Sequence, residues 1–136
     1  ILIKDNHIGV CGGVTQAIER VQHYLKNRLP SEQGEARSVG VAGGAVAPLL
    51  IEVECDSLGQ VEEAVAAGVD WILLDNMVPA LLRKAVTINA GKAKLEASGG
   101  VNLQTVRAIA ETGVDIISTS QITLSAPSAD IHLELI

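Results

Sequence analysis

Residues 67–76, Ala-Gly-Val-Asp-Trp-Ile-Leu-Leu-Asp-Asn, contain the end of a helix, a turn and a complete strand. Gly68 follows a helical stripe of apolar residues and can adopt the left-handed conformation that ends many helices. The apolar run Trp71–Leu74 is too short for a helix, and such runs between helical patterns are typical of parallel strands covered on both faces. The stretch therefore predicts one helix–strand step of an α/β fold, with Asp75 at the carboxyl end of the strand.

The same step occurs again at residues 112–117, Thr-Gly-Val-Asp-Ile-Ile, as expected for stacked βα units. Apolar runs and helical spacing predict strands at 1–4, 49–54, 71–75, 93–96 and 115–119. Helices are predicted at 14–29 and from residue 57 to the turn at Gly68, where Ser57 and Gln60 form a capping box. A third helix is predicted with Pro79 in its first turn. A fourth is predicted after Asn102, with Leu103 facing inward. A loop is expected over 5–13. Repeated steps in one direction predict either a portion of an incomplete TIM-like α/β barrel with parallel strands or an open parallel sheet.

Composition limits the size and the partners of the chain. Its 136 residues make one domain at most, fewer than the roughly 250 residues of a closed (β/α)8 barrel. The net charge of −6 argues against binding to nucleic acid or to an anionic membrane. No apolar run approaches the ~20 residues that span a bilayer. Cys11 and Cys55 lack metal-type spacing and are expected to be buried free thiols, so we expect a cytoplasmic protein.

The chain begins directly with a strand, Ile1-Leu2-Ile3-Lys4, without an initiating methionine. We therefore expect residues 1–136 to be a catalytic-domain fragment whose amino-terminal part is absent. Residues 31–48 break the helical pattern with four glycines and mixed charges, and we expect a flexible insertion there.

Several of the predicted strands end on an ionisable side chain: Lys4, Glu54, Asp75 and Glu96. Ligands of βα folds bind at the carboxyl ends of the strands, so this ring predicts a site for a charged substrate. Glu52 shares a strand face with Glu54 because side chains alternate along a strand. Glu52 is also open to a purely structural interpretation, as the partner of Lys4 or Lys94 inside a barrel.

Two further motifs follow predicted strands. The Asp75 carboxylate could hold ribose hydroxyls or a divalent cation, or Asp75 and Asn76 could merely cap the next helix. Ser98-Gly99-Gly100 lies between a strand and a helix, where backbone N–H groups and a helix N-terminus can bind phosphate; a simple tight turn is the alternative. The hydroxyls of Ser118, Thr119 and Ser120 could complete such a cradle. His7 could act beside Lys4 or make a loop hydrogen bond.

Read in order, five motifs resemble those of the quinolinate phosphoribosyltransferases, also called nicotinate-nucleotide pyrophosphorylases (carboxylating). They are Leu-Ile-Lys-Asp-Asn-His-Ile at 2–8, Ile-Glu-Val-Glu at 51–54, Leu-Leu-Asp-Asn-Met at 73–77, Leu-Glu-Ala-Ser-Gly-Gly-Val at 95–101 and Thr-Gly-Val-Asp-Ile-Ile at 112–117. The closing Ser125-Ala126-Pro127 and Asp130-Ile131 fit as well. The resemblance covers the whole chain except residues 31–48.

The resemblance implies that quinolinate and phosphoribosyl pyrophosphate, with Mg²⁺, give nicotinate mononucleotide, pyrophosphate and CO2. It implies an incomplete α/β barrel, an amino-terminal sandwich domain and a homodimer that shares its active sites. By motif position Lys4 would contact the substrate carboxylate or the donor. Glu54 and Asp75 would hold the ribose hydroxyls and the metal-bound diphosphate, and Ser98, Gly99, Gly100 and Ser120 would bind the 5′-phosphate.

The chain also departs from the family. The family motif Val-Gly-Ala-Leu-Thr-His-Ser reads Thr-Ser-Gln-Ile-Thr-Leu-Ser at 119–125, so Ser120 replaces glycine and Leu124 replaces a phosphate-side histidine. The family's arginine-rich quinolinate pocket has no counterpart here, and we expect little activity from these residues alone. Alternatives are a degenerate non-catalytic domain, a paralogue linked to molybdenum transport, and an aldolase that uses Lys4 or Lys94 as a Schiff-base amine.

Overall fold

The computed structural model describes residues 1–28, 49–124, 131 and 133–134. The expected insertion at 31–48 and most of the closing motif lie outside these residues. The strands are β1 (Leu2–Ile3), β2 (Glu52–Cys55), β3 (Trp71–Asp75), β4 (Lys94–Ser98) and β5 (Ile116–Ile117). The helices are α1 (Asp5–Cys11), α2 (Val14–Arg28), α3 (Leu58–Ala66), α4 (Pro79–Asn89), α5 (Val106–Ala110) and α6 (Gln121–Leu124).

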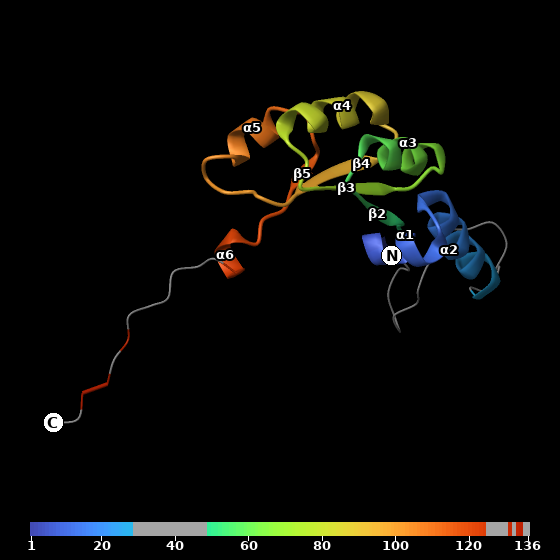
Figure 1. Ribbon diagram of the computed structural model, residues 1–136, viewed down its shortest axis with the longest axis horizontal. Helices are drawn as coiled ribbons and strands as arrows, with labels where there is room; N and C mark the ends of the chain where they lie inside the picture. The colour runs from blue at the N-terminus through green and yellow to red at the C-terminus, as the bar shows by residue number, and fades with distance from the viewer. Residues whose placement is uncertain (29–48, 125–130, 132, 135–136) are drawn as a thin grey trace, which may run out of the picture.

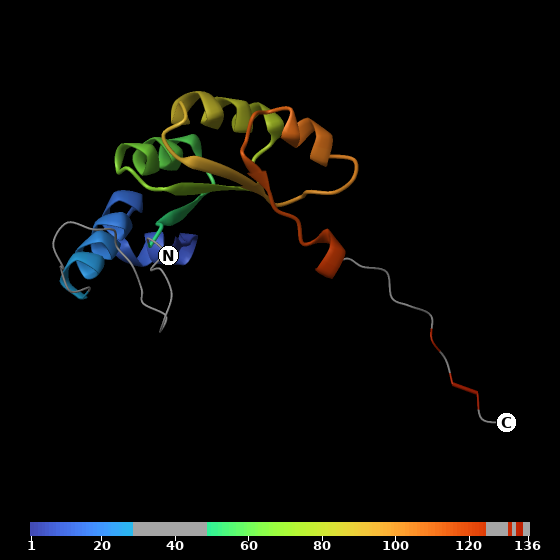
Figure 2. The same cartoon turned by 180° about the vertical axis from the view of Figure 1, so that it is seen from behind.

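The strands form one sheet in the order β1-β2-β3-β4-β5, and every neighbouring pair is parallel. When the strand order is sequential, right-handed crossovers place all the connecting helices on the same face. Helices α3, α4 and α5 do lie together on one side of the sheet in both views (Figures 1 and 2). This arrangement confirms the predicted portion of an α/β barrel, with α3, α4 and α5 on the same face of the sheet.

The core lies between the sheet and its helices. Alternate strand residues on the helix side are almost completely buried, and they are Ile3, Val53, Cys55, Ile72, Leu74, Leu95 and Ala97. Their neighbours on the other face are partly or fully exposed, with Glu52 and Glu54 among them. The alternation predicted for Ile51, Glu52, Val53 and Glu54 is therefore confirmed. We call the side away from the helices the open face.

The prediction of a loop over residues 5–13 is wrong, because residues 5–11 form helix α1. The Lys4 backbone N–H donates to His7 Nδ1 at 2.9 Å, which satisfies one of the free donors at the start of the helix. Ile8 is buried against the core, and Gly12 ends the helix in the left-handed conformation. Of the two interpretations of His7, the local hydrogen bond is the one observed.

Other boundaries also differ from the prediction, since β1, β2 and β5 are shorter than the predicted strands at 1–4, 49–54 and 115–119. Strand β4 continues to Ser98, two residues beyond Glu96. Helix α5 begins only at Val106 because Asn102 Oδ1 accepts from the backbone N–H groups of Gln104 and Thr105 and holds a turn there. Leu103, expected inward, is 90% exposed on this turn.

The repeated Gly-Val-Asp segment has a structural role that spacing alone did not show. Gly68 and Gly113 both have positive φ. The carboxylate of Asp70 accepts from the backbone N–H of Ile51 at 2.8 Å, and that of Asp115 accepts from Leu95 at 2.9 Å. Each aspartate thus joins the start of its own strand to the neighbouring one.

The two cysteines have different environments. Cys55 is fully buried, and burial raises the pKa of its thiol to about 12, with the acidic neighbours Asp56, Glu63 and Glu54 adding to the shift. This confirms a buried free thiol at that position. Cys11 is only half-buried, which differs from the expectation. Among the described residues, no helix is long and apolar enough to cross a membrane.

The Lys94–Asp115 pair should make stability pH-dependent. Lys94 Nζ donates to Asp115 Oδ1 at 2.6 Å, and this hydrogen bond and that from Leu95 lower the pKa of Asp115. Because the pKa of Asp115 is lower in the folded state than in the unfolded state, the ionised carboxylate stabilises the fold at pH values above the unfolded-state pKa. This contribution disappears as the pH falls through the folded-state pKa. Asp115→Asn should therefore be less stable than the parent near pH 7, with the difference shrinking below about pH 4. Urea unfolding at pH 7 and pH 3 measures this.

Lys94→Met is the control for that experiment, because it removes the main cause of the shift and leaves Asp115 in place. In the Lys94→Met background the effect of Asp115→Asn should depend less on pH. An equal destabilisation by Asp115→Asn at both pH values would contradict the assignment.

Candidate functional site

The carboxyl ends of the strands collect most of the predicted site residues. Lys4 directly follows β1, Glu54 lies near the end of β2, Asp75 ends β3 and Ser98 ends β4. Asp75 and Ser98 are register partners, so they lie at the same level of the sheet. Glu54 and Glu96 are both in register with Leu73, two residues before Asp75, so these two glutamates lie at the same level below the rim. The predicted strand end at Glu96 was wrong because β4 continues to Ser98. The side chains at or near the strand ends are therefore Lys4, Glu54, Asp75 and Ser98.

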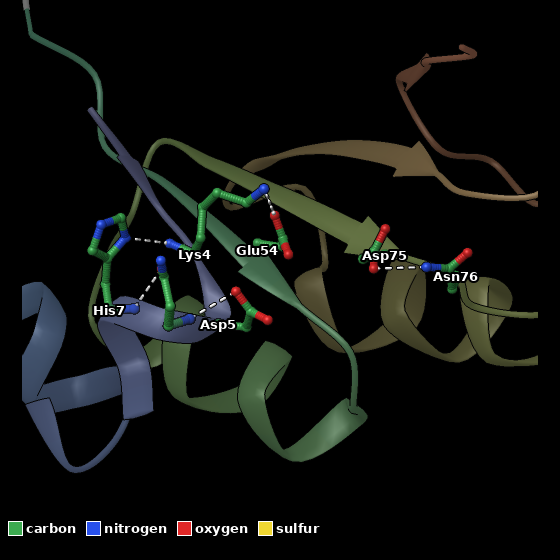
Figure 3. Close-up of polar contacts among 7 residues, drawn as sticks. Lys4, Asp5, His7, Glu54, Asp75 and Asn76 are labelled. Atoms are coloured by element: carbon green, nitrogen blue, oxygen red, sulfur yellow. Dashed lines mark hydrogen bonds and ion pairs between the residues drawn. The ribbon is translucent and has the colours of Figure 1, made fainter. Parts of the chain in front are cut away.

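Lys4 and Glu54 form an ion pair across the first two strands. Lys4 Nζ lies 3.5 Å from Glu54 Oε2, with the lysine side chain 50% exposed and the glutamate 17% exposed. Figure 3 shows the Lys4 side chain extending from the start of α1 toward Glu54, on the same face as Asp75. A partly exposed ammonium beside a partly buried carboxylate can exchange this contact for a ligand's anionic group.

Glu52 and Glu96 belong to the interior of the open face. Burial raises the pKa of Glu52 above its ordinary value, and the nearby Glu96 and Glu54 carboxylates raise it further. The Ser118 hydroxyl donates to Glu96 Oε1, which ties β4 to the segment after β5. Glu96 thus has a structural partner.

The expected pairing of Glu52 with a lysine is not what the structure shows. Lys4 pairs with Glu54, and Lys94 pairs with Asp115 at the amino-terminal end of the strands. The register places Lys94 opposite Trp71, far along the strands from the rim. Lys94 therefore lies away from the carboxyl ends of the strands and is already paired, so the structure does not support it as a Schiff-base amine there.

Asp75 does not cap the following helix. Helix α4 begins at Pro79 with Val78 at its cap position, so the helix-cap interpretation of Asp75 and Asn76 is wrong. Asn76 Nδ2 instead donates to Asp75 Oδ2 at 2.8 Å, as drawn in Figure 3. Asp75 is partly exposed on the open face, and its carboxylate is available to a ligand there.

A pocket of about 460 Å³ lies beside Asp75 at the same end of the sheet. The predicted segments 98–100 and 118–120 come together in this pocket. The pocket is lined by Ser98, Gly99, Gly100, Val101, Asn102, Ser118, Thr119, Ser120, Gln121 and Thr123. Thr119 Oγ1 donates to the Val101 carbonyl at 2.9 Å and fastens one segment to the other. Sequence reasoning missed Asn102 and Thr123 as lining residues, because neither their spacing nor their chemistry marks them.

The phosphate-binding groups of this pocket come from loops. Gly99 and Gly100 both have positive φ, and within the described chain their backbone N–H groups donate no hydrogen bond. Successive free N–H groups in such a loop suit an anion. The expected contribution of a helix N-terminus does not hold, since α5 starts at Val106 and has only five residues.

The two departures from the family motif have different structural consequences. Ser120 lines the pocket and is not among the residues with positive φ, so serine causes no backbone strain there. Its hydroxyl can donate to an anion. Leu124 is 83% exposed at the end of α6 and offers no hydrogen bond where the family has histidine.

The donor set for a metal is small. Across the described ranges, no group of three or more His, Cys, Asp or Glu side chains lies close enough together to hold a metal ion. Glu54 and Asp75 share the open face, and Glu54 already contacts Lys4. Mg²⁺ is commonly bound by one or two carboxylates together with substrate phosphates. The residues fit that arrangement and not a cage made by the protein alone.

These features define a segment of a parallel β/α barrel whose rim carries carboxylates beside a loop suited to an anion. The family model described as the C-terminal domain of quinolinate phosphoribosyl transferase matches residues 36–134. The chain belongs to this family, as its motifs predicted.

Individual relatives agree with this assignment. The chain is 35% identical over 135 residues to a probable nicotinate-nucleotide pyrophosphorylase (carboxylating) of Bacillus subtilis, covering 99% of this chain and 40% of the relative. It is 34% identical to the nicotinate-nucleotide pyrophosphorylase (carboxylating) of Rattus norvegicus, with coverage of 99% and 40%. The crystal structure of the Ehrlichia chaffeensis nicotinate-nucleotide pyrophosphorylase is 46% identical, with a TM-score of 0.73 over 92% of this chain and 38% of that one.

The chain therefore spans about 40% of the length of the curated relatives it matches. Some plant relatives are named as chloroplastic or mitochondrial. The expected cytoplasmic location of this chain stays a prediction.

Proposed function

We propose that the polypeptide carrying this chain transfers the phosphoribosyl group of phosphoribosyl pyrophosphate to quinolinate and releases pyrophosphate and CO2. The observation that carries the proposal is the placement of Glu54, Asp75 and the Ser98–Gly100 pocket at one end of the sheet, in a member of this family. The names of the relatives supply the reaction. The site supplies groups suited to each part of the donor.

The pocket and the carboxylates have separate tasks in this reaction. The free N–H groups of Gly99 and Gly100 and the hydroxyls of Ser98 and Ser120 would bind the 5′-phosphate. The quinolinate nitrogen forms a bond to the anomeric carbon while the bond from that carbon to pyrophosphate breaks. Positive charge develops on the ribose during this step, and the Asp75 and Glu54 carboxylates can stabilise it while they hold the ribose hydroxyls.

Decarboxylation needs cations that the described residues do not place at the rim. After transfer, the carbon–carbon bond to the adjacent carboxylate breaks, the electron pair passes to the ring carbon, and that carbon takes up a proton. Among the described side chains, Arg20, Arg83 and Arg107 lie on α2, α4 and α5, and only Lys4 is a cation at the carboxyl end of a strand. We therefore place the remaining cations on other parts of the polypeptide or on a second subunit of a homodimer.

Mg²⁺ belongs to this proposal as a partner of the donor. Bound to the diphosphate, it would neutralise charge on the leaving group. Asp75 and Glu54 would contact it from the protein side, and Lys4 would then turn from Glu54 toward the diphosphate or the quinolinate carboxylate.

The test uses the natural polypeptide that contains this sequence, purified and supplied with quinolinate, phosphoribosyl pyrophosphate and Mg²⁺. We expect nicotinate mononucleotide and an equal amount of CO2. Residues 1–136 alone should give little product. Folded natural polypeptide without product would contradict the proposal and favour a degenerate domain, and borohydride trapping of a carbonyl substrate on Lys4 would favour the aldolase alternative.

A further inference from the structure

We infer that Asn76 is a positioning residue that fixes the Asp75 carboxylate relative to the Ser98–Gly100 loop. The inference rests on the proposed function, because it assigns ribose to Asp75 and phosphate to the loop. Sequence reasoning treated Asn76 only as a possible helix cap. Three contacts in the structure give it a different role.

The first contact is made by the backbone. Asn76 has a φ of 53°, a left-handed conformation that asparagine tolerates better than most residues. Its N–H donates to the Ser98 carbonyl at 2.9 Å, immediately before the two glycines. The chain leaving β3 is therefore joined directly to the start of the phosphate loop.

The second contact is made by the side chain. Asn76 Nδ2 donates to Asp75 Oδ2 at 2.8 Å, and a hydrogen bond to a charged acceptor is stronger than a neutral one. The remaining carboxylate oxygen, Asp75 Oδ1, is left for a ligand. The amide thereby selects one orientation of the Asp75 side chain.

The third contact is a close fit against Gly99. A Cβ atom placed on Gly99 would lie 2.1 Å from Asn76 Oδ1 and 2.9 Å from the Asn76 backbone nitrogen. No side chain can occupy that space while Asn76 keeps its position. Gly99 is thus required by Asn76 as well as by the positive φ of the loop, and the two residues interlock.

Together these contacts make Asn76 the link between two half-sites. A ligand that carries both a phosphate and a ribose, such as ribose 5-phosphate, needs the loop and Asp75 at the correct separation. Inorganic phosphate needs the loop alone. Loss of the link should therefore affect the first ligand much more than the second.

The experiment measures calorimetric binding of ribose 5-phosphate and of inorganic phosphate to the natural polypeptide and to Asn76→Gly. Glycine keeps the left-handed backbone and removes the amide, so the fold should survive. We expect about a tenfold or greater loss of affinity for ribose 5-phosphate and less than about a threefold loss for phosphate. A matched control is Ala90→Gly, at the other non-glycine residue with positive φ, which lies at the end of α4. It should change neither affinity.

A second variant pair tests the interlock. Gly99→Ala should weaken binding of both ligands, because its methyl group would displace the Asn76 amide and would also lie 2.9 Å from the backbone nitrogen of residue 76. Adding Asn76→Gly should then cause little further loss of affinity for ribose 5-phosphate, because the amide is already displaced. Equal losses for both ligands in Asn76→Gly would overturn the inference, and so would a loss of ribose 5-phosphate affinity in the double variant as large as the two single losses combined. Failure of the proposed function has a different signature: the unaltered polypeptide would bind no ribose 5-phosphate and form no nucleotide.

Discussion

Replacement of Asp75 by asparagine is expected to lower kcat/KM for nucleotide formation by about a hundredfold or more, comparable to the loss of one preorganised electrostatic group in other active sites. Asparagine keeps the size of the side chain and an oxygen that Asn76 Nδ2 can still contact. What disappears is the negative charge opposite the ribose in a cation-like transition state. Initial-rate kinetics at varied donor concentration measure the effect on the natural polypeptide.

Glu111→Gln is the matched control, since it removes one carboxylate charge at an exposed ion pair with Arg107, beyond α5. Exposed pairs of this kind contribute little, so its kinetics should match the parent. A fall in donor affinity at several Mg²⁺ concentrations for Asp75→Asn alone would support the assigned contact with the metal-bound diphosphate. Unchanged kinetics in Asp75→Asn would contradict the catalytic role assigned to Asp75.

Glu54 should behave differently from Asp75 because of its neighbour. Its carboxylate is already partly neutralised by Lys4 at 3.5 Å, whereas the contact recorded for Asp75 is with the neutral Asn76 amide. Asp75 is therefore the stronger candidate for stabilising developing positive charge. Lys4 and Glu54 are suited to orienting the anionic parts of the two substrates.

The fold was predictable wherever local pattern and burial agree. Trp71–Asp75 was predicted with its observed bounds because an apolar run of that length, followed by Pro79 in a new helix, has few alternatives. Helix α1 was missed because Gly9 and Gly12 indicate a loop, while the hydrogen bond from Lys4 to His7 and the burial of Ile8 outweigh that tendency. The late start of α5 likewise depends on Asn102 holding a turn.

The parts of the site that lie at strand ends were predictable, because the strands themselves could be located from the sequence. Alternation placed Glu54 on the open face, and topology brought Ser98–Gly100 beside Ser118–Ser120. The level of Glu96 and the role of Asn76 could not be found in this way. The first depends on how far β4 continues beyond Glu96, and the second depends on contacts of Asn76 with the Ser98 carbonyl and Gly99, which are distant from it in the sequence.

Leu74→Ala should cause the largest loss of stability, because Leu74 lies at 0% exposure on the helix-covered face of the central strand. It pairs in register with Cys55 and Ala97, both also buried, so the structure has little freedom to close the resulting cavity. Removing a buried leucine in such a place costs about 2–5 kcal/mol. That is a large part of the ~5–15 kcal/mol that stabilises a typical domain. Urea unfolding followed by circular dichroism measures it.

The position of Leu74 also links this loss to function. Asp75 follows directly on the same strand, so a shift of β3 into the cavity would move the carboxylate away from the phosphate loop. We therefore expect Leu74→Ala to lower affinity for ribose 5-phosphate even at temperatures where the variant stays folded. Leu103→Ala, at a leucine 90% exposed in this chain, is the control and should change the free energy of unfolding by less than about 0.5 kcal/mol. A cost below about 1 kcal/mol for Leu74→Ala would mean that the core beneath β3 is less tightly packed than the burial of Leu74 indicates.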